Sequence, residues 1–215
     1  ALDQAALAAA LAEGVKRVVI ADGNYDLSGV NVNGATIVGA SKNVVVKPCP
    51  CTYNGVKSIS DVTFENVTIT VPETNSYSGL QGQNESYKNC VINGQYWLYS
   101  KNTTFEECVF NTTDANNYNV WTYGAANVEF TKCTFNSAGK SVLIYKESLG
   151  GATYNVTFNE CELNASAPVE GKAAIEIDSS FPNGGGGKYN VVINTTTANG
   201  FANGNVSGNP LWNQK

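Results

Sequence analysis

The chain contains no histidine and no methionine, and Arg17 is the only arginine among its 215 residues. Histidine is the usual general base and a frequent metal ligand near neutral pH, so its absence excludes catalysis and metal binding that depend on it. Charged residues make up only 14% of the sequence and the net charge is −5, which argues against nucleic-acid binding. The apolar runs are short, such as VVI at 18–20, so no segment can span a bilayer.

The sequence also lacks an initiator methionine and a signal peptide. This predicts a chain processed or excised from a precursor whose targeting segment, if one existed, has been removed. We expect an extracellular, cell-surface or virion location.

A short pattern recurs along the chain. Its copies are NVEFTKCTFN (127–136), NTTFEECVFN (102–111), NVTFNECELN (155–164) and DVTFENVTIT (61–70), and YKNCVIN (87–93) joins them. Alignment gives a Phe column and a Val/Cys column: Phe64, Phe105, Phe130 and Phe158, then Val67, Cys90, Cys108, Cys133 and Cys161. A third column holds Ile69, Ile92, Phe110, Phe135 and Leu163. Apolar and polar residues alternate as in half-buried strands, and polar pairs such as Thr131-Lys132 mark bends. We therefore expect two strands joined by a bend in each repeat, with these columns stacked inside.

A second family of strands precedes the repeats, at 95–100, 118–124, 141–146 and 173–178. It aligns two further columns: Trp97, Trp121, Leu143 and Ile175, and Tyr99, Tyr123, Tyr145 and Ile177. The aromatic columns either face the interior or form an exposed strip that stacks sugars. The alternate face carries Leu98, Thr122, Ile144 and Glu176 and is more polar, so we expect the aromatic columns inside.

Three short strands per repeat, with turns of variable length, are typical of a coiled repeat architecture. Over nearly the whole chain, this pattern resembles the right-handed, single-stranded parallel β-helix of the pectate-lyase-like superfamily. The resemblance implies one all-β domain over 1–215, with a capping helix at 1–14, rungs at 15–200 and a tail or cap at 201–215. A helix at the start would cover the apolar lumen and the strand edges of the first rung.

Four of the six cysteines occupy the column that holds Val67 in another repeat. We therefore expect them to be free, buried thiols, although neighbours one strand apart lie near the lower limit for a disulfide. Cys49 and Cys51 lie in a Pro-rich turn and could bridge each other. A turn with two cysteines and no histidine lacks the other ligands for a metal, so we expect neither a metal site nor a cofactor.

Lyases of the resembled superfamily use a basic residue, often arginine, beside an aspartate cluster that holds calcium, and its hydrolases use Asp clusters with His, Arg and Lys motifs. None of these motifs is present here. Glu106 or Glu107 nearly aligns with Glu129 and Glu160 at the bends, and Glu129, Glu160 and Lys132 are the candidates for an atypical carboxylate site. Solvated turn residues explain them better, and we favour that interpretation.

Asn-Xaa-Ser/Thr sequons are frequent, at Asn66, Asn84, Asn102, Asn111, Asn155, Asn164, Asn194 and Asn205. Asparagine ladders at strand bends explain them without glycans. The Gly-rich insertions at 146–154 and 178–189 should protrude on one side, which favours partner binding there. The candidate binding residues are Tyr118, Tyr154, Phe181 and Asp178.

These features predict a non-catalytic structural or adhesive β-helix, such as a phage virion appendage or decoration component or a microbial surface module. We expect it to bind a partner or a glycan and to self-associate, as a homo-oligomer such as a trimer or within a larger assembly. One alternative is a lyase or hydrolase with an atypical carboxylate site. Another is ice binding, which needs a flat threonine array, whereas the alignment scatters the threonines of this sequence between bends.

Overall fold

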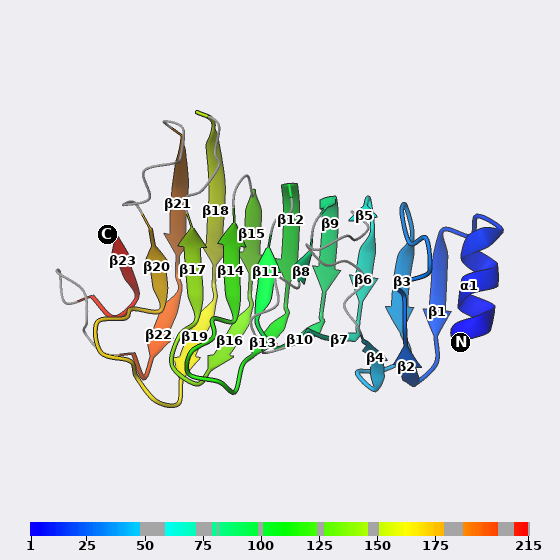
Figure 1. The fold of residues 1–215 in the computed structure, drawn as a ribbon, viewed down its shortest axis with the longest axis horizontal. Coiled ribbons are helices and arrows are strands. Elements are labelled where there is room, and N and C mark those ends of the chain that lie inside the picture. The colour runs from blue at the N-terminus through cyan, green and yellow to red at the C-terminus, as the bar shows by residue number, and fades with distance from the viewer. Residues whose placement is uncertain are drawn as a thin grey trace.

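The computed structural model describes residues 1–47, 59–71, 79–80, 82–98, 101–123, 127–145, 151–178, 187–201 and 209–214. Three parallel sheets run along the length of the molecule, and most successive strands along the chain belong to different sheets (Figure 1). The architecture is an all-β parallel β-helix with one short N-terminal helix, as the repeats predict.

The strands of each sheet stack in chain order. The first sheet contains β1 (Arg17–Ile20), β3 (Thr36–Gly39), β6 (Thr63–Glu65), β9 (Gly82–Lys88), β12 (Lys101–Glu106), β15 (Val128–Thr131), β18 (Thr153–Asn159) and β21 (Lys188–Asn194), with β5 (Ile59–Ser60) beside β9. The second contains β2 (Gly23–Tyr25), β4 (Val44–Val46), β7 (Thr68–Thr70), β10 (Val91–Asn93), β13 (Val109–Asn111), β16 (Thr134–Ser137), β19 (Glu162–Ala165) and β22 (Thr197–Asn199). The third contains β8 (Gly79–Leu80), β11 (Tyr96–Leu98), β14 (Val120–Tyr123), β17 (Val142–Tyr145), β20 (Ile175–Ile177) and β23 (Trp212–Gln214).

The interior is filled by stacks of like side chains, as the repeat columns predict. Phe105, Phe130 and Phe158 lie in register on β12, β15 and β18, and neighbouring ring centroids are 5.1 Å apart. Tyr87 of β9 continues this stack, with its ring 4.9 Å from that of Phe105. Phe110 and Phe135 form a parallel stack on the second sheet at 4.7 Å. Because every lumen position has a partner one strand away, the core runs through successive rungs.

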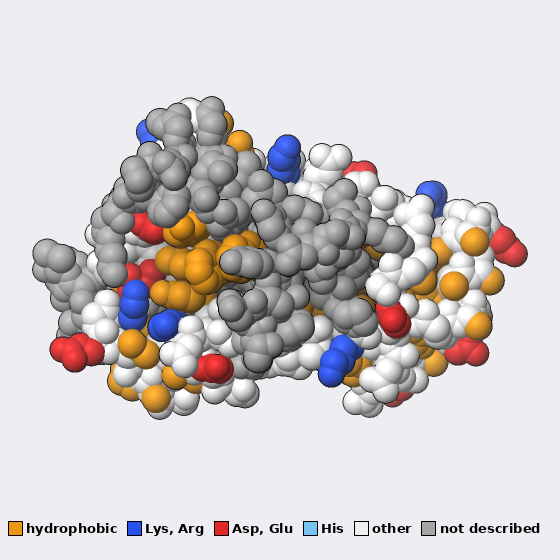
Figure 2. All heavy atoms as spheres, viewed as in Figure 1, with side chains coloured by type: hydrophobic (Ala, Val, Ile, Leu, Met, Phe, Trp, Pro, Cys, Tyr) orange, Lys and Arg blue, Asp and Glu red, His pale blue; other side chains and the backbone are white. Residues whose placement is uncertain are grey.

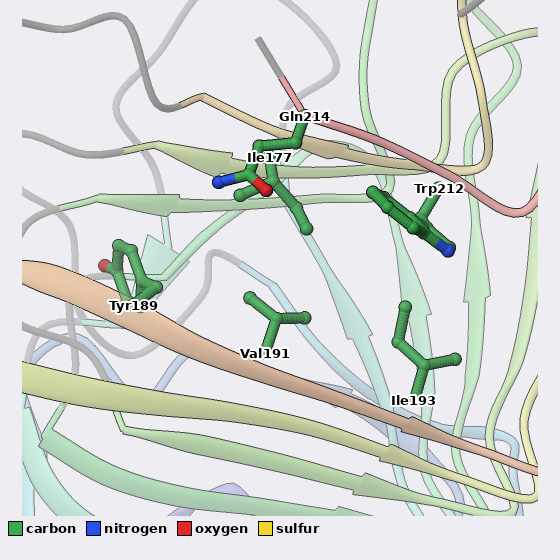
Figure 3. Close-up of a pocket in the computed structure, with 6 residues that line it drawn as sticks. All are labelled: Ile177, Tyr189, Val191, Ile193, Trp212 and Gln214. Carbon is green, nitrogen blue, oxygen red and sulfur yellow. The ribbon is translucent and has the colours of Figure 1, made fainter. Parts of the chain in front are cut away.

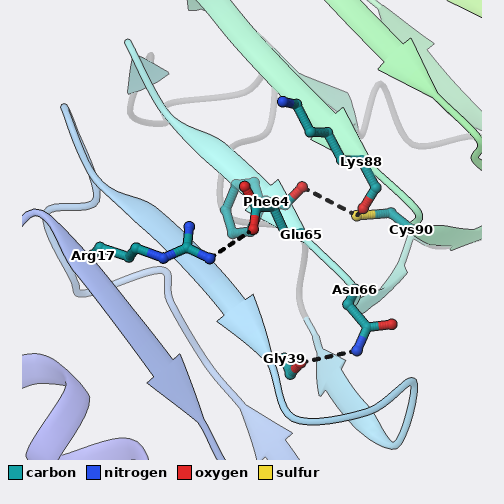
Figure 4. Close-up of polar contacts among 7 residues, drawn as sticks. All are labelled: Arg17, Gly39, Phe64, Glu65, Asn66, Lys88 and Cys90. Carbon is teal, nitrogen blue, oxygen red and sulfur yellow. Dashed lines mark hydrogen bonds and ion pairs between the residues drawn. The ribbon is translucent and has the colours of Figure 1, made fainter.

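The bend between the first and second sheets uses a left-handed residue in each repeat. Asn66, Asn89, Glu107, Lys132 and Glu160 all have φ between 48° and 55°. The cysteine follows the bend: Cys90 Sγ lies 3.4 Å from Phe64 O and 3.3 Å from Lys88 O (Figure 4). Its column is buried and its four members are free thiols, which confirms the expectation; Cys49 and Cys51 lie outside the described residues.

The N-terminal helix α1 (Gln4–Ala12) begins where the Asp3 side chain accepts a hydrogen bond from the Ala6 N–H at 2.9 Å. Its Leu7 is fully buried against the first rung. Arg17 on β1 forms an ion pair with Glu65 at 3.1 Å (Figure 4). Helix α1 therefore closes this end of the lumen. The single arginine forms its ion pair with β6 on the outside of the first sheet.

Glycine is required at Gly94, where φ is +100° and a Cβ atom would collide with the Val71 carbonyl oxygen. Gly14 also has positive φ, +82°, but a Cβ atom there would meet nothing within 4 Å. We expect Gly94→Ala to lower the unfolding free energy by about 3 kcal/mol and Gly14→Ala by about 1 kcal/mol. Urea unfolding of both variants measures the difference, and equal losses would contradict the close approach at Val71.

The third sheet reverses the expected faces of the aromatic columns. Its register places Trp97, Trp121, Leu143, Glu176 and Asn213 in one column. The residues that alternate with this column fill the core: Tyr96, Leu98, Val120, Val142, Ile144 and Ile175. Trp97, Trp121 and Tyr145 therefore lie on the outer face, and their predicted interior position was wrong. Tyr99 and the side chain of Tyr123 lie outside the described residues.

The cause of this error is a one-residue shift in the alignment of the last strand. Ile175 pairs with Val142, and Glu176 takes the place beside Leu143 that was predicted for Ile175. Such a shift moves every side chain of a strand to the opposite face. Thr122 is fully buried in the lumen, where its hydroxyl accepts a hydrogen bond from the Tyr145 N–H at 3.3 Å. Thr122, whose polar side chain argued against an interior position for this face, therefore has a hydrogen-bond partner in the core.

Candidate functional site

The outer face of the third sheet carries a groove of about 510 Å³, here called the aromatic groove. Its walls include Trp121, Leu143, Tyr145, Tyr118, Glu176 and Asp178. Figure 2 shows hydrophobic side chains gathered over β14, β17 and β20, with basic and acidic side chains beside them. An apolar hollow with a few polar groups is the usual form of a ligand site.

Aromatic contacts fix the floor of the groove. The rings of Trp97 and Trp121 stack with centroids 4.6 Å apart and an interplanar angle of 18°. The rings of Tyr118 and Tyr145 meet Trp121 edge to face at 6.0 and 5.7 Å. Since each ring is held by its neighbours, the groove presents a preformed aromatic surface at little cost in side-chain entropy.

The polar rim is also held in place. Glu176 is buried and accepts hydrogen bonds from the Ala173 N–H at 2.6 Å and from Asn213 Nδ2 at 3.1 Å. Lys140 Nζ donates to Asn116 O at 3.2 Å and lies 5.6 Å from the centroid of the Tyr118 ring. Burial, and then the negative charges of Glu176 and Asp178, raise the pKa of Tyr118 above its ordinary value. The Tyr118 hydroxyl therefore stays protonated near neutral pH.

The structure brings two of the predicted binding residues together and separates the others. Tyr118 and Asp178 both line the aromatic groove. Tyr154 lies instead on β18 of the first sheet, where its ring is 6.4 Å from that of Tyr189 on β21. Phe181 falls outside the described residues, as do most residues of both Gly-rich insertions.

Sequence reasoning placed Trp121 in the interior, and it missed Lys140 and Glu176 as members of a site. The available signal was Glu176 itself, because a carboxylate in the strand AAIEID fits an outer face better than a lumen. Aligning the strands on that carboxylate would have placed the tryptophans outside.

The structure places one of the three candidates for a carboxylate site on a strand and the other two at bends. Glu129 is exposed on β15 and accepts a hydrogen bond from Asn159 Nδ2 at 3.0 Å. Among the described residues, it is the only carboxylate along a shallow hollow of about 360 Å³ whose other walls include Thr104 and Thr157. Glu160 and Lys132 occupy exposed left-handed positions of the bend. Glycoside hydrolysis needs two converging carboxyl groups, and the described residues around Glu129 supply one.

Some threonines on the first sheet align in a column, whereas Thr103 is buried and Thr131 lies in another column. Register aligns Thr36, Thr63, Ser86, Thr104, Glu129 and Thr157. The parallel column two residues further along each strand holds Glu65, Lys88 and Glu106. A flat array of paired threonines is therefore not formed on these strands, because charged side chains occupy its second column.

Asparagine side chains form ladders along the bends, as expected from the sequons. Asn111, Asn136, Asn164 and Asn199 each donate through Nδ2 to the asparagine one rung before, over 3.0–3.3 Å. Asn66, Asn84, Asn102 and Asn194 also use their amide nitrogens as donors, and Asn155 accepts from Asn190. The donating amide nitrogens are the atoms to which a glycan would attach, and here they form hydrogen bonds between rungs. Asn205 lies outside the described residues.

No protein-family model, curated protein or solved structure matches this chain. Membership of the pectate-lyase-like superfamily therefore stays a prediction. Within the described part of the chain, no three Cys, Asp or Glu side chains are grouped to hold a metal ion. No helix among the described residues is long and apolar enough to cross a membrane.

Proposed function

We propose that this protein is a non-catalytic adhesive β-helix that binds a glycan in the aromatic groove, as part of a virion appendage or a microbial surface module. The observation that carries the proposal is the outward-facing Trp121, with Tyr118 and Tyr145 edge-on and polar groups at the rim. A sugar ring offers an apolar C–H face and a rim of hydroxyls. The C–H face can stack on an aromatic surface, and the hydroxyls can form hydrogen bonds with carboxylates, a lysine and a tyrosine hydroxyl.

Glu176 is held in a fixed orientation at the rim. Its two carboxylate oxygens accept hydrogen bonds from Ala173 and Asn213, which tie it to the turn before β20 and to β23. Each oxygen keeps a further lone pair, so a carboxylate held in this way can orient a bound hydroxyl. Asp178, two residues further along the same face, supplies a second acceptor at the rim.

The experiment is binding of the purified chain to a panel of immobilised neutral and acidic glycans, followed by titration of the strongest ligand. We expect Trp121→Ala to weaken that binding about tenfold or more, because the stacking surface is lost. Tyr154→Ala is the matched control, since it removes an aromatic ring outside the groove, and its affinity should equal that of the native chain. Circular dichroism of both variants checks the fold.

Two results would overturn the proposal. One is the absence of binding across the panel, or equal affinity of the native chain and the Trp121 variant. The other is the release of new reducing ends or unsaturated products during incubation, which would identify an enzyme.

A further inference from the structure

The four cysteines of the column repeat one geometry in successive rungs. Cys90, Cys108, Cys133 and Cys161 lie beside one another, since the residues that follow them pair in register on β10, β13, β16 and β19. Each Sγ atom lies 3.4 Å from a backbone oxygen of the rung before, and these oxygens belong to Phe64, Tyr87, Phe105 and Phe130. Because each side chain is placed in the same way, the sulfurs form a row with the spacing of parallel strands, about 4.8 Å.

This row has the spacing of a linear metal ion with two thiolate ligands. An ion midway between two sulfurs about 4.8 Å apart lies about 2.4 Å from each, close to the length of a zinc–thiolate bond. Zinc itself takes four tetrahedral ligands, whereas Cu(I) is a soft ion that thiolates select and that two of them can bind in a line. Such an ion needs fewer ligands than the groups of three that are absent from the described residues. The sequence-based expectation of no metal site assumed a four-ligand geometry, which the row does not require.

A buried cation lies beside the first two sulfurs. The Lys42 Nζ atom is buried and has no hydrogen-bond partner. The Lys42 backbone oxygen accepts a hydrogen bond from the Thr68 hydroxyl at 2.8 Å, which places the residue beside Val67, one rung before Cys90. Burial lowers the pKa of Lys42, and the negative charge of the Cys90 and Cys108 thiolates raises it. A buried ammonium group without a partner is costly, and an anionic group between these sulfurs would offset that cost.

The row of sulfurs is enclosed by protein. The four cysteines are at most 2% exposed and belong to the same core as the phenylalanine stacks. Among the described lining residues, no sulfur borders the aromatic groove, the hollow beside Glu129, or the hollow of about 310 Å³ between β21 and strands β20 and β23. Figure 3 shows the last of these hollows. An ion in the row would therefore have no water ligands, and it would enter only when the rungs open.

We propose that the cysteine column binds Cu(I) between the sulfurs of adjacent rungs. Each ion displaces the protons of two thiols into solvent and leaves a dithiolate complex with one negative charge. Because each sulfur binds one ion, the row holds one ion between Cys90 and Cys108 and another between Cys133 and Cys161. The Lys42 ammonium group neutralises the first complex. Both ions join neighbouring rungs of the folded chain, so they stabilise the fold.

Counting bound ions tests this site. Every protein in the experiment carries Cys49→Ser and Cys51→Ser, so that only the column responds. Each protein is refolded from urea with excess Cu(I) under anaerobic conditions, because burial of the sulfurs would otherwise limit access. A weak copper chelator then removes loosely bound ions, and native mass spectrometry counts those that remain. We expect two ions in the chain that keeps all four cysteines of the column.

Two double variants separate a linear pair from ordinary thiol binding. Cys90→Val with Cys108→Val leaves the adjacent Cys133 and Cys161, and it should hold one ion. Cys108→Val with Cys161→Val leaves Cys90 and Cys133, which are two rungs apart, and it should hold none. Valine fills the same column at Val67, so both variants should fold, and circular dichroism checks this. A folded native chain without ions, or equal ion counts in the two variants, would overturn the proposal.

The buried lysine provides a second readout. In a chain that keeps only Cys90 and Cys108, Lys42→Met should weaken Cu(I) binding about tenfold or more in competition with a chelator. The reason is that the anionic complex loses its counter-charge in surroundings of low dielectric constant. In a chain that keeps only Cys133 and Cys161, the same substitution should leave the affinity unchanged. Equal effects in both chains would overturn the pairing of Lys42 with the first ion. Glycan binding in the aromatic groove is a separate measurement, so the two proposals fail independently.

Discussion

Replacing Phe130 with alanine is expected to lower the unfolding free energy by about 4 kcal/mol, the largest stability loss that we predict for one side chain. Phe130 is fully buried, and its ring stacks between Phe105 and Phe158 with both centroids at 5.1 Å. It also meets Phe110 and Phe135 edge to face. The cavity left by alanine would interrupt both phenylalanine stacks in the middle of the rod, where rigid sheets on each side prevent collapse.

Urea unfolding followed by tryptophan fluorescence measures this loss. Thr104→Ala is the control, because Thr104 lies on the exposed face of the neighbouring strand and should change stability by less than about 0.5 kcal/mol. A loss below about 1 kcal/mol for Phe130→Ala would contradict the continuous stack.

Alkaline pH is expected to destabilise the protein through the cysteine column. Burial raises the pKa of Cys90 and of Cys133. The hydrogen bond with Cys133, together with burial, raises the pKa of Cys108 from 9.0 to about 12. A thiol whose pKa is raised on folding contributes its stability below the unfolded pKa of 9.0, and this contribution is lost as the pH rises toward the folded value. Cys161 opposes the trend, because its hydrogen bond with Cys133 lowers its pKa.

We expect the unfolding free energy to fall by at least about 2 kcal/mol between pH 9 and 11, at about 1.4 kcal/mol for each unit of pKa difference. The measurement is urea unfolding in the presence of a reductant at several pH values. Cys108→Val should flatten the fall, because valine fills the same column at Val67 and does not titrate. Tyrosine and lysine titrate in both proteins, so only the difference between them reports on the thiol. An identical pH dependence would show that thiol ionisation is not responsible.

The repeat pattern was sufficient to predict the stacked side chains of the core. The Phe130 column, the cysteine column and the left-handed bends follow from residues close together in each repeat, where alternation and a polar interruption fix the side-chain directions. Tyr87 escaped the alignment because the segment around Cys90 was matched only through its cysteine and Ile92. The helix at Gln4–Ala12 was also predictable, from its Ala/Leu composition and the stop at Gly14.

The third sheet was not predictable in the same way. Its strands are joined to the repeats by turns of different lengths, so the sequence does not fix which residue of AAIEID lies beside Leu143. A shift of one residue exchanges the lumen and the surface, and it moved Trp97, Trp121 and Tyr145 to the wrong side. The aromatic groove forms only in the observed alignment of this sheet, which also brings Tyr118 and Asp178 to the same groove.

The sequence alone determined that this chain coils into rungs, that the four thiols of the cysteine column are buried and reduced, and that histidine chemistry is absent. Local alternation and composition carry that information, because each strand needs only its own residues to define two faces. Only the tertiary structure decided which face of the third sheet meets solvent. This depends on how rungs align across sequence separations of more than twenty residues, and backbone hydrogen bonds between strands set that alignment.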